Sequence, residues 1–523
     1  MTRARRVLLF VSLSLVTSLI LVGASTVADA AGTRNWPAYL FSPVHRSKGG
    51  STAITPSNVG SMWRAWSFTA ASISGRPNAS FVASPIVYGG TVFIGSNTGV
   101  LYALRQSSGA ILWTRSFGFV TQTTCASSAG IRSTVTVAPD PNTGTPTVYA
   151  VTGDAQLVAL EAATGTTKWT AAIATPSTTQ NDYYIWSSPT VSAGHVYIGV
   201  SSQCDHPLVQ GGVKMFDRAT GALQATWHSV PDGTVGGSVW SSVASDGQSV
   251  FVTTGNAGTS DGNDSNSIVR LNASTLDRLA GWQVPASEAV NDSDFGGSPT
   301  IFYRNSTEYV GACNKDGIYY VWNAQTLQLA WERTLSPGTA SGINARLAAA
   351  AWDGSHLLVA APHSTIQGTT YNGSVRMLNA ADGSSIWETG LPGIVIGSPS
   401  LNSPASSPFR CTTRPAGRTG PRSSTRRTGR CFEPSRPAPC SRNPRSPGST
   451  CSSRRRAAGW SRGGSRSVDH DEEEVRSGDR ETGQPSLRDA RDLVEIRVRG
   501  ASSRLRCGCR FGRGEPSCHR VPR

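Results

Sequence analysis

Residues 188–199 read Ser-Pro-Thr-Val-Ser-Ala-Gly-His-Val-Tyr-Ile-Gly, and residues 213–227 read Val-Lys-Met-Phe-Asp-Arg-Ala-Thr-Gly-Ala-Leu-Gln-Ala-Thr-Trp. Apolar side chains alternate with others in both stretches, a pattern that indicates β-strands with two distinct faces. The Ala-Thr-Gly in the second stretch predicts a tight turn, because glycine accepts the positive φ that such turns need. The two stretches together therefore predict four short antiparallel strands that end at Trp227.

The same unit recurs along the 523-residue chain. Its Ser-Pro start is found at residues 84–85, 188–189, 298–299 and 398–399, and its closing tryptophan at Trp113, Trp169, Trp227, Trp282, Trp331 and Trp387. The closing tryptophans lie roughly 47 to 58 residues apart when Trp66 is included, a period expected of four-stranded propeller blades. The sequence thus predicts an all-β, eight-bladed β-propeller over residues 32–407, with each tryptophan filling the gap between two blades.

The segment Trp63–Phe68 looks like the outermost strand of a blade without its first three strands. In a closed propeller, strands from the C-terminal part of the chain complete such a blade. We therefore expect the missing strands to come from the region beyond residue 400.

The first 31 residues are predicted to be a secretion signal. Three arginines within residues 3–6 precede an uncharged apolar run over residues 7–22, and Ala28-Asp29-Ala30 supplies the small residues of a cleavage site. The apolar run is short for a membrane span, although an uncleaved anchor is the alternative. We expect a secreted or periplasmic protein of the cell envelope, without a membrane span after cleavage, in a compartment where disulfides form.

The formal net charge of +15 does not describe the predicted propeller. Residues 1–408 contain equal numbers of basic and acidic side chains, so the whole excess lies in the remaining residues. Because the body of the protein is neutral, the sequence argues against nucleic acid as a partner.

Residues 408–523 are rich in Arg, Ser, Pro and Gly, contain no Lys and hold seven of the ten cysteines. A disordered basic tail is one interpretation. The genetic code favours another: when the third base of each codon is read with the first two bases of the next, residues 420–429 permit Thr-Ala-Val-Leu-Asp-Ala-Ala-Asp-Gly. That string closely matches Met-Leu-Asn-Ala-Ala-Asp-Gly at residues 377–383. Residues 457–462 permit Gly-Gly-Leu-Val-Ala in the same way, and we predict a frameshift that disrupts the last blades and leaves an out-of-frame, disordered tail.

The repeat and its order resemble the pyrroloquinoline-quinone (PQQ) dehydrogenases, the quinoprotein alcohol dehydrogenase family, and in particular its polyvinyl-alcohol-dehydrogenase-like branch. The likeness covers roughly residues 35–402 and includes the opening Asn-Trp-Pro-Ala-Tyr at residues 35–39. It implies an oxidoreductase that oxidises an alcohol or polyol by hydride transfer to PQQ, with calcium as a second cofactor.

Three segments resemble the parts of that family that bind the quinone. Gly-Gly-Ser-Val-Trp-Ser-Ser at residues 236–242 resembles the segment that places a tryptophan under the quinone ring, here Trp240. Asn-Lys-Asp-Gly at residues 314–317 resembles the segment whose cation contacts the quinone, here Lys315. Arg132 resembles an arginine near the cofactor carboxylates. Each residue also has an ordinary structural interpretation, such as a core ring or a solvated charge.

Three oxygen-bearing side chains resemble the metal and catalytic residues of the family. Asn256 in Thr-Gly-Asn matches a calcium-binding asparagine, and Asp294 matches the catalytic aspartate, which we also expect to bind calcium. The family's calcium-binding glutamate has no clear match, and Asp205 occupies that neighbourhood. We expect Asp294 to accept the proton of the alcohol as hydride leaves its carbon.

The cysteines depart from the family pattern. The vicinal pair of many relatives is absent, and Cys125 stands alone nearby; Cys125, Cys204 and Cys313 are predicted to be buried or free thiols. No Cys-x-x-Cys-His haem motif occurs, so electrons would pass to an external acceptor such as a separate cytochrome.

Two functions from different classes remain open from the sequence. The ordered set of candidate residues favours a quinone-dependent alcohol dehydrogenase. The missing glutamate and cysteine pair favour a non-catalytic exported scaffold that binds proteins or glycans.

Overall fold

The computed structural model describes residues 35–70, 79–120, 130–177, 182–258, 264–289, 292–337 and 347–404. The predicted signal peptide and the predicted out-of-frame tail lie outside the described residues. The described part is built almost entirely of β-strands, with one short 3₁₀ helix, η1 (Val59–Ser61). None of its helices has the length and apolar character needed to span a bilayer.

Six four-stranded antiparallel sheets follow one another along the described chain, each with its strands in sequence order. The first three sheets contain β2 (Ile86–Tyr88), β3 (Thr91–Gly95), β4 (Val100–Arg105) and β5 (Ile111–Ser116); β6 (Thr136–Pro139), β7 (Pro146–Val151), β8 (Gln156–Glu161) and β9 (Thr167–Ala172); and β10 (Thr190–Ser192), β11 (His195–Val200), β12 (Gly212–Asp217) and β13 (Leu223–His228). The next three contain β14 (Ala244–Ser245), β15 (Ser249–Thr253), β16 (Ser267–Asn272) and β17 (Arg278–Gln283); β18 (Thr300–Arg304), β19 (Thr307–Cys313), β20 (Ile318–Asn323) and β21 (Leu329–Thr334); and β22 (Ala351–Trp352), β23 (His356–Ile366), β24 (Thr369–Asn379) and β25 (Ser385–Leu391).

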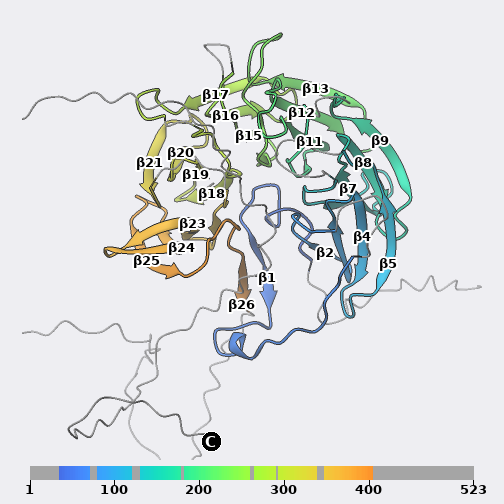
Figure 1. Cartoon of the computed structure of the whole chain (residues 1–523), viewed down its shortest axis with the longest axis horizontal. Helices are drawn as coiled ribbons and strands as arrows, with labels where there is room; N and C mark the ends of the chain where they lie inside the picture. The colour runs from blue at the N-terminus through green and yellow to red at the C-terminus, as the bar shows by residue number, and fades with distance from the viewer. Residues whose placement is uncertain are drawn as a thin grey trace, which may run out of the picture. The chain divides into compact units, whose positions relative to one another are not determined.

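These sheets are the blades of a β-propeller. Figure 1 shows them arranged around a common centre, with the fourth strand of each sheet at the rim. Each large apolar cluster combines residues of two successive sheets; one of them joins Phe93 and Leu101 to Val148 and Val158. The predicted all-β propeller of four-stranded blades is confirmed, and the count of eight blades stays a prediction.

The Ser-Pro start of each repeat has a physical explanation in the structure. The serine or threonine hydroxyl accepts a hydrogen bond from the equivalent backbone N–H of the preceding blade, so that a line of bonds passes from blade to blade around the centre. The bonds run from Ser84 N to Thr134 Oγ1 (3.1 Å), from Thr134 N to Ser188 Oγ (3.0 Å), from Ser188 N to Ser242 Oγ (2.9 Å) and from Ser242 N to Ser298 Oγ (3.0 Å). These bonds, three of them buried, fix the angular position of each blade against its neighbour.

The closing tryptophans join the blades at the rim. Trp113 packs on Gly165, in the outer turn of the next blade, and donates its indole N–H to Ala162 O at 3.0 Å. Trp331 packs on Gly383 in the same way and donates to Ala380 O at 3.1 Å. A Cβ on Gly165 would lie 2.8 Å from the Trp113 ring, so the glycine is needed both for its positive φ (71°) and for the contact.

Residues 63–68 make the same contact without belonging to a complete sheet. Trp66 packs on Gly109 of the first blade and donates its indole N–H to Gln106 O at 2.8 Å. This is the position of a closing tryptophan, as the sequence predicted, although residues 62–70 are not assigned to any strand. The remaining strands of that blade are not among the described residues.

A short stretch near the N-terminus, residues 36–48, crosses the centre of the ring and is called the axial segment below. Its carbonyls accept backbone hydrogen bonds from first strands of separate blades. The donors are Val137 to Pro37 O, Ser245 to Pro43 O, Ile301 to Val44 O and Trp352 to Arg46 O, at 2.8 to 3.0 Å. The segment then continues into β1 (Lys48–Thr52), which pairs in parallel with β26 (Leu401–Pro404) and lies beside it in Figure 1.

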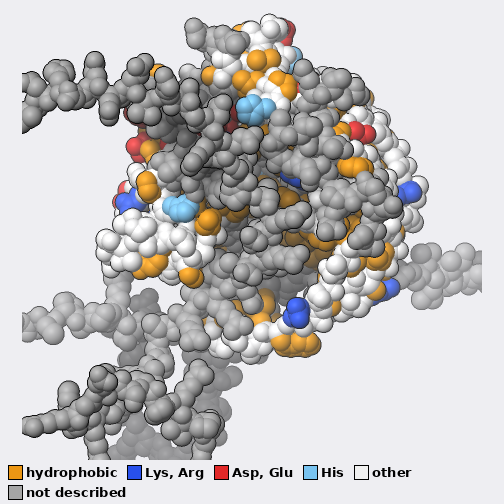
Figure 2. Space-filling model, viewed as in Figure 1, with side chains coloured by type: hydrophobic (Ala, Val, Ile, Leu, Met, Phe, Trp, Pro, Cys, Tyr) orange, Lys and Arg blue, Asp and Glu red, His pale blue; other side chains and the backbone are white. Residues whose placement is uncertain are grey.

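The charges of the described surface are dispersed. On the face shown in Figure 2, the Lys and Arg side chains of the described residues lie singly and form no patch.

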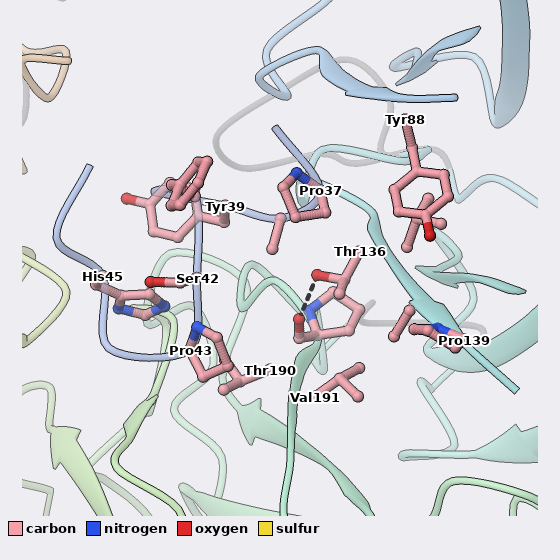
Figure 3. A pocket seen from close by; sticks show the side chains of 15 residues that line it. Pro37, Tyr39, Ser42, Pro43, His45, Tyr88, Thr136, Pro139, Thr190 and Val191 are labelled. Atoms are coloured by element: carbon pink, nitrogen blue, oxygen red, sulfur yellow. Dashed lines mark hydrogen bonds between the residues drawn. The ribbon is translucent and has the colours of Figure 1, made fainter. Parts of the chain in front are cut away.

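A cavity of about 360 Å³ lies between the axial segment and the first strands of the second and third blades. Figure 3 shows Tyr39, Pro43 and His45 of the segment opposite Thr136, Thr190 and Val191 of the blades. The lining is mainly apolar and contains neither a carboxylate nor a cationic side chain. This cavity does not include any of the predicted site residues.

Candidate functional site

The predicted site residues lie at the same end of their sheets. Trp240 and Asp294 precede first strands β14 and β18, whereas Asn256 and Lys315 follow second strands β15 and β19. Because first and second strands are antiparallel, these loops meet at one mouth of the ring. Direct bonds between neighbouring loops confirm this: Lys315 N donates to Asp294 O at 3.0 Å, and Phe295 N donates to Thr254 O at 3.3 Å.

Asp294 lies at the centre of the site. Its Oδ2 accepts the indole N–H of Trp240 at 2.8 Å, and its Oδ1 is 2.5 Å from Lys315 Nζ. The ammonium of Lys315 also lies 5.1 Å from the centre of the Trp240 ring. A Cβ on Gly296 would come within 2.6 Å of that ring, so glycine is required for Trp240 to approach the Asp294 loop.

A second group of side chains surrounds Asn256. Its Nδ2 donates to Asp205 Oδ2 at 3.0 Å and to Asp292 Oδ1 at 2.8 Å. Asp205 is held by Ser202, whose Oγ donates to Asp205 Oδ1 at 2.6 Å. Lys315 Nζ joins the two groups, because it also contacts Asp292 Oδ1 at 2.9 Å. Together, Asp205, Asn256, Asp292, Asp294 and Lys315 are called the charged cluster below.

Burial dominates the electrostatics of Asp294, which is 2% exposed. Loss of solvation raises the pKa of Asp294 to about 6, and the neighbouring Lys315 ammonium offsets only part of the effect. Burial alone would lower the pKa of Lys315, but the Asp294 and Asp292 carboxylates outweigh it and the pKa is raised. Lys315 is therefore charged, and Asp294 is a carboxylate that takes up a proton more readily than an exposed one.

Arg132 lies in the equivalent loop before β6, where it packs on Trp186. Its guanidinium carbon is 5.4 Å from the centre of the Trp186 ring. Tyr184 packs edge-on against Trp186 at 4.6 Å between centroids and donates its hydroxyl to Gly130 O at 2.9 Å. The third blade thus fixes the Arg132 loop of the second. No contact between Arg132 and the charged cluster is seen within the described residues.

The prediction that all three body cysteines are thiols is wrong for Cys204, which is disulfide-bonded. Its partner is not among the described residues. Cys313 is buried and outside any disulfide, as predicted, and Cys125 lies outside the described residues. Spacing could not reveal the bond, because the sequence offers no paired pattern around Cys204. The disulfide fixes the residue directly before Asp205.

Comparisons with known proteins place the chain in a family. Residues 36–332 match the family model described as "PQQ: Glucose/ethanol/alcohol dehydrogenase, beta-propeller domain". The chain belongs to this PQQ β-propeller family. The quinohemoprotein alcohol dehydrogenase of Comamonas testosteroni is 28% identical over 214 residues, which are 39% of this chain and 27% of that protein. The chain thus aligns with only about a quarter of that relative's length.

Two solved structures have a similar fold. A europium-containing methanol dehydrogenase superposes with a TM-score of 0.56 at 18% identity, covering 71% of this chain and 81% of that one. The quinohemoprotein alcohol dehydrogenase ADHIIG of Pseudomonas putida HK5 gives a TM-score of 0.57 at 18% identity, covering 71% and 68%. At this identity the likeness concerns the fold, and the PQQ family assignment confirms the resemblance found in the sequence. The polyvinyl-alcohol-dehydrogenase-like branch stays a prediction.

The structure brings five of the six predicted site residues into one set of contacts: Asp205, Trp240, Asn256, Asp294 and Lys315. Sequence reasoning missed Asp292 and Trp186. Trp186-Ser187-Ser188 repeats the register of Trp240-Ser241-Ser242, and that signal could have identified Trp186. Asp292 could be found only from its neighbours in space.

The cluster fits the cofactors that the family implies. The cluster holds three carboxylates and one ammonium, and Asp292 and Asp294 contact the ammonium directly, so fully ionised side chains leave an excess of negative charge that suits a cation. No group of three or more His, Cys, Asp or Glu side chains is arranged as a metal site in the described ranges, so a cation here would depend on the Asn256 amide and on a bound ligand. Ser133 Oγ, Gln203 Nε2 and Asn314 Nδ2 are buried polar atoms without a partner in the described part of the chain. They belong to residues next to Arg132, Cys204 and Lys315, as expected of a site for a polar ligand.

Proposed function

We propose that this protein oxidises an alcohol or polyol, with PQQ as the electron acceptor and a divalent cation, calcium, beside it. The observation that carries the proposal is the contact of Asp294 with both Trp240 and Lys315, because it joins a base, an aromatic plate and a cation at one mouth of the ring. When bound, PQQ supplies a two-electron acceptor for the hydride of the alcohol.

The residues of the chain would divide the remaining tasks. The Trp240 indole offers an apolar face to a flat ring, and Lys315 and Arg132 offer positive charge to its carbonyl and carboxylate oxygens. Asp205, Asn256 and Asp294 supply the hard oxygen atoms that calcium prefers.

Asp294 would act as the general base. Its carboxylate takes the hydroxyl proton of the alcohol as hydride leaves the adjacent carbon, and the products are a carbonyl compound and reduced PQQ. Such assistance is worth roughly 10²–10⁴-fold in rate. Lys315 keeps the carboxylate oriented and partly ionised despite its burial, which an isolated buried aspartate would not be.

Further features of the proposal concern the setting of the reaction. The protein would act in the cell envelope after loss of residues 1–31, and it would pass electrons to a separate cytochrome or similar acceptor, because the sequence has no haem motif of its own. We further propose that strands encoded by the shifted reading frame complete the ring. The contact of Trp66 with the first blade favours this, because a closing tryptophan makes that contact from the neighbouring blade.

Reconstitution tests the proposal. The chain as printed and the chain with its frame repaired after residue 407 are each mixed with calcium and PQQ, and reduction of a redox dye is followed with a series of primary alcohols and polyols. We expect alcohol-dependent dye reduction that disappears when either cofactor is left out. PQQ binding without any substrate oxidation would contradict the enzymatic role, and absence of PQQ binding by absorbance would favour the exported scaffold that binds proteins or glycans.

A further inference from the structure

A second cavity, of about 380 Å³, lies between the second and third blades near their outer strands and is called the rim pocket below. It is lined by the end of β9, by β12 and β13, and by Tyr183. Within the described residues, its lining shares no side chain with the charged cluster and includes no carboxylate. Its volume is in the range of sites for small ligands.

Lys214 of β12 brings a cation to the rim pocket. The side chain is half-buried, and its Nζ donates to Ile173 O at 2.6 Å. The ammonium has no carboxylate partner in the described part of the chain, whereas Lys315 contacts two carboxylates of the charged cluster. Burial lowers the pKa of Lys214, as expected for an ammonium without an opposite charge beside it. An anion in the pocket would offset this cost of burial.

The equivalent position carries an apolar or aromatic side chain in the first two blades. Tyr102, Val158 and Lys214 each lie just before the register shift between the third and fourth strands of their sheets, and each pairs with a threonine of the fourth strand. Tyr102 and Val158 are buried in apolar clusters. Packing between blades therefore does not require a cation here, and Lys214 needs another explanation.

The sixth blade also has a cation at this position, and there the sheet provides its counter-charge. Arg376 pairs in register with Glu388 of the fourth strand, and its Nε lies 3.1 Å from Glu388 Oε1. In the third blade the residue opposite Lys214 is Thr226, which is uncharged. The sixth blade thus contains the anion that its cation needs, and the third blade does not.

The other residues of the lining limit the charge and the shape of a ligand. His228 Nδ1 lies 2.7 Å from Asp232 Oδ1, so any charge on this histidine is already balanced. The Lys214 ammonium therefore suits an anion with a single charge, rather than phosphate, which carries nearly two at neutral pH. Tyr183 and Val200 offer the body of the ligand an aromatic ring and an apolar side chain.

We propose that the rim pocket binds a small organic monocarboxylate, whose carboxylate accepts a hydrogen bond from the Lys214 ammonium. The site is separate from the mouth of the ring and uses none of the residues assigned to the proposed oxidation.

Acylation of lysines tests the inference on the full chain without PQQ or alcohol, so its outcome does not depend on the proposed dehydrogenase activity. The chain has four lysines, and peptide mass spectrometry gives the labelling rate of each: Lys48, Lys168, Lys214 and Lys315. Benzoate and gluconate are the probes, with benzamide as the uncharged analogue and sodium chloride as the ionic control. We expect one of the two carboxylates to slow labelling of Lys214 about tenfold along a saturable curve, because only the unoccupied pocket reacts.

Labelling of Lys168, which pairs with Asp140 outside the pocket, should not change. Absence of saturable protection of Lys214 by either carboxylate would overturn the inference. Equal protection by inorganic phosphate or by chloride would overturn the choice of a carboxylate ligand.

Two variants separate a ligand site from a structural lysine. Thr226→Glu copies the Arg376–Glu388 pair, so it should raise the thermal midpoint and weaken the carboxylate binding measured by calorimetry. Lys214→Met introduces an apolar side chain, as in the first two blades, and should fold but lose the same binding. We expect losses of about tenfold or more, the size expected for a hydrogen bond to a charged group. Lys168→Met is the matched control and should bind as the wild type does. If either variant folds and binds the carboxylate as tightly as the wild type, the inference is overturned.

Discussion

The charged cluster and the axial segment both connect distant blades, but they do so with different chemistry. The axial segment contributes backbone carbonyls, which bond to first strands of several blades whatever its side chains are. The charged cluster contributes side chains that no other repeat carries, and it buries Asp294 against Lys315. Backbone bonds add stability with little dependence on sequence, whereas buried charges contribute little net stability and mark sites of function.

The largest effect is expected on catalysis, from a substitution in the charged cluster. Asp294→Asn keeps the size of the side chain and its bond to Trp240, but it removes the proton acceptor. We expect the kcat for alcohol oxidation by the reconstituted protein to fall by about 10²–10⁴-fold. The thermal midpoint should change little, because Lys315 retains Asp292 as a partner.

Dye reduction and thermal unfolding are measured on the same preparation, with Asp277→Asn as the control at an exposed position. An Asp294→Asn variant that turns over alcohol at the wild-type rate would remove Asp294 from the reaction. A variant that fails to fold would show instead that the cluster is structural, which is the role assigned above to the axial segment.

The next effect concerns stability and tests the axial segment through His45. This side chain is buried, and Nδ1 lies 3.0 Å from Pro299 O in the fifth blade. Burial lowers the pKa of His45 from 6.5 to about 4. The unfolded chain therefore takes up a proton on His45 near pH 6.5, whereas the folded chain does so only near pH 4. The free energy of unfolding falls as the pH is lowered from about 6.5 to about 4.

The loss should reach about 3.5 kcal/mol at most, since each pH unit between the two pKa values is worth about 1.4 kcal/mol. Urea unfolding at several pH values measures it. His45→Gln retains an N–H donor and cannot titrate, so its stability should lack this component of the acid dependence. If wild type and variant lose stability in parallel, His45 does not contribute.

The repeating parts of the fold were predictable from sequence because each has a physical reason to recur. Serines of the Ser-Pro starts, such as Ser188 and Ser298, accept a backbone hydrogen bond from the preceding blade, and four of the closing tryptophans, Trp66, Trp113, Trp169 and Trp331, pack on a glycine of the next blade. Even Trp66, outside any complete sheet, obeys this rule. Periodicity therefore predicted strands, blade order and the rim contacts.

The cluster was only partly predictable, because its members deviate from the repeat and lie in different blades. Resemblance to a family pointed to Asp294, Lys315 and Trp240, which the structure brings together. Asp292 was not predicted as a member of the charged cluster, because an aspartate in a polar loop has no periodic signal. Its contacts join the loops of two blades, through Asn256 and Lys315. The axial segment was not predicted for a related reason. Its bonds to the blades come mainly from backbone carbonyls, which every residue has and which therefore give no sequence signal.

The smallest effect is expected on PQQ affinity, from the loss of the ring that contacts Arg132. Trp186 holds the Arg132 guanidinium by a cation–π contact, in the position that Trp240 occupies one blade later. Trp186→Leu keeps an apolar side chain and removes the ring, so Arg132 loses a contact worth about 0.5–1 kcal/mol. We expect the Kd for PQQ to rise about two- to fivefold by absorbance titration, and Trp186→Phe to lie between wild type and Trp186→Leu. If Trp186→Leu binds PQQ as wild type does while Arg132→Met does not, Arg132 needs no positioning by Trp186. If both bind as wild type does, the mouth near the second blade lies outside the quinone site, and the charged cluster alone defines it.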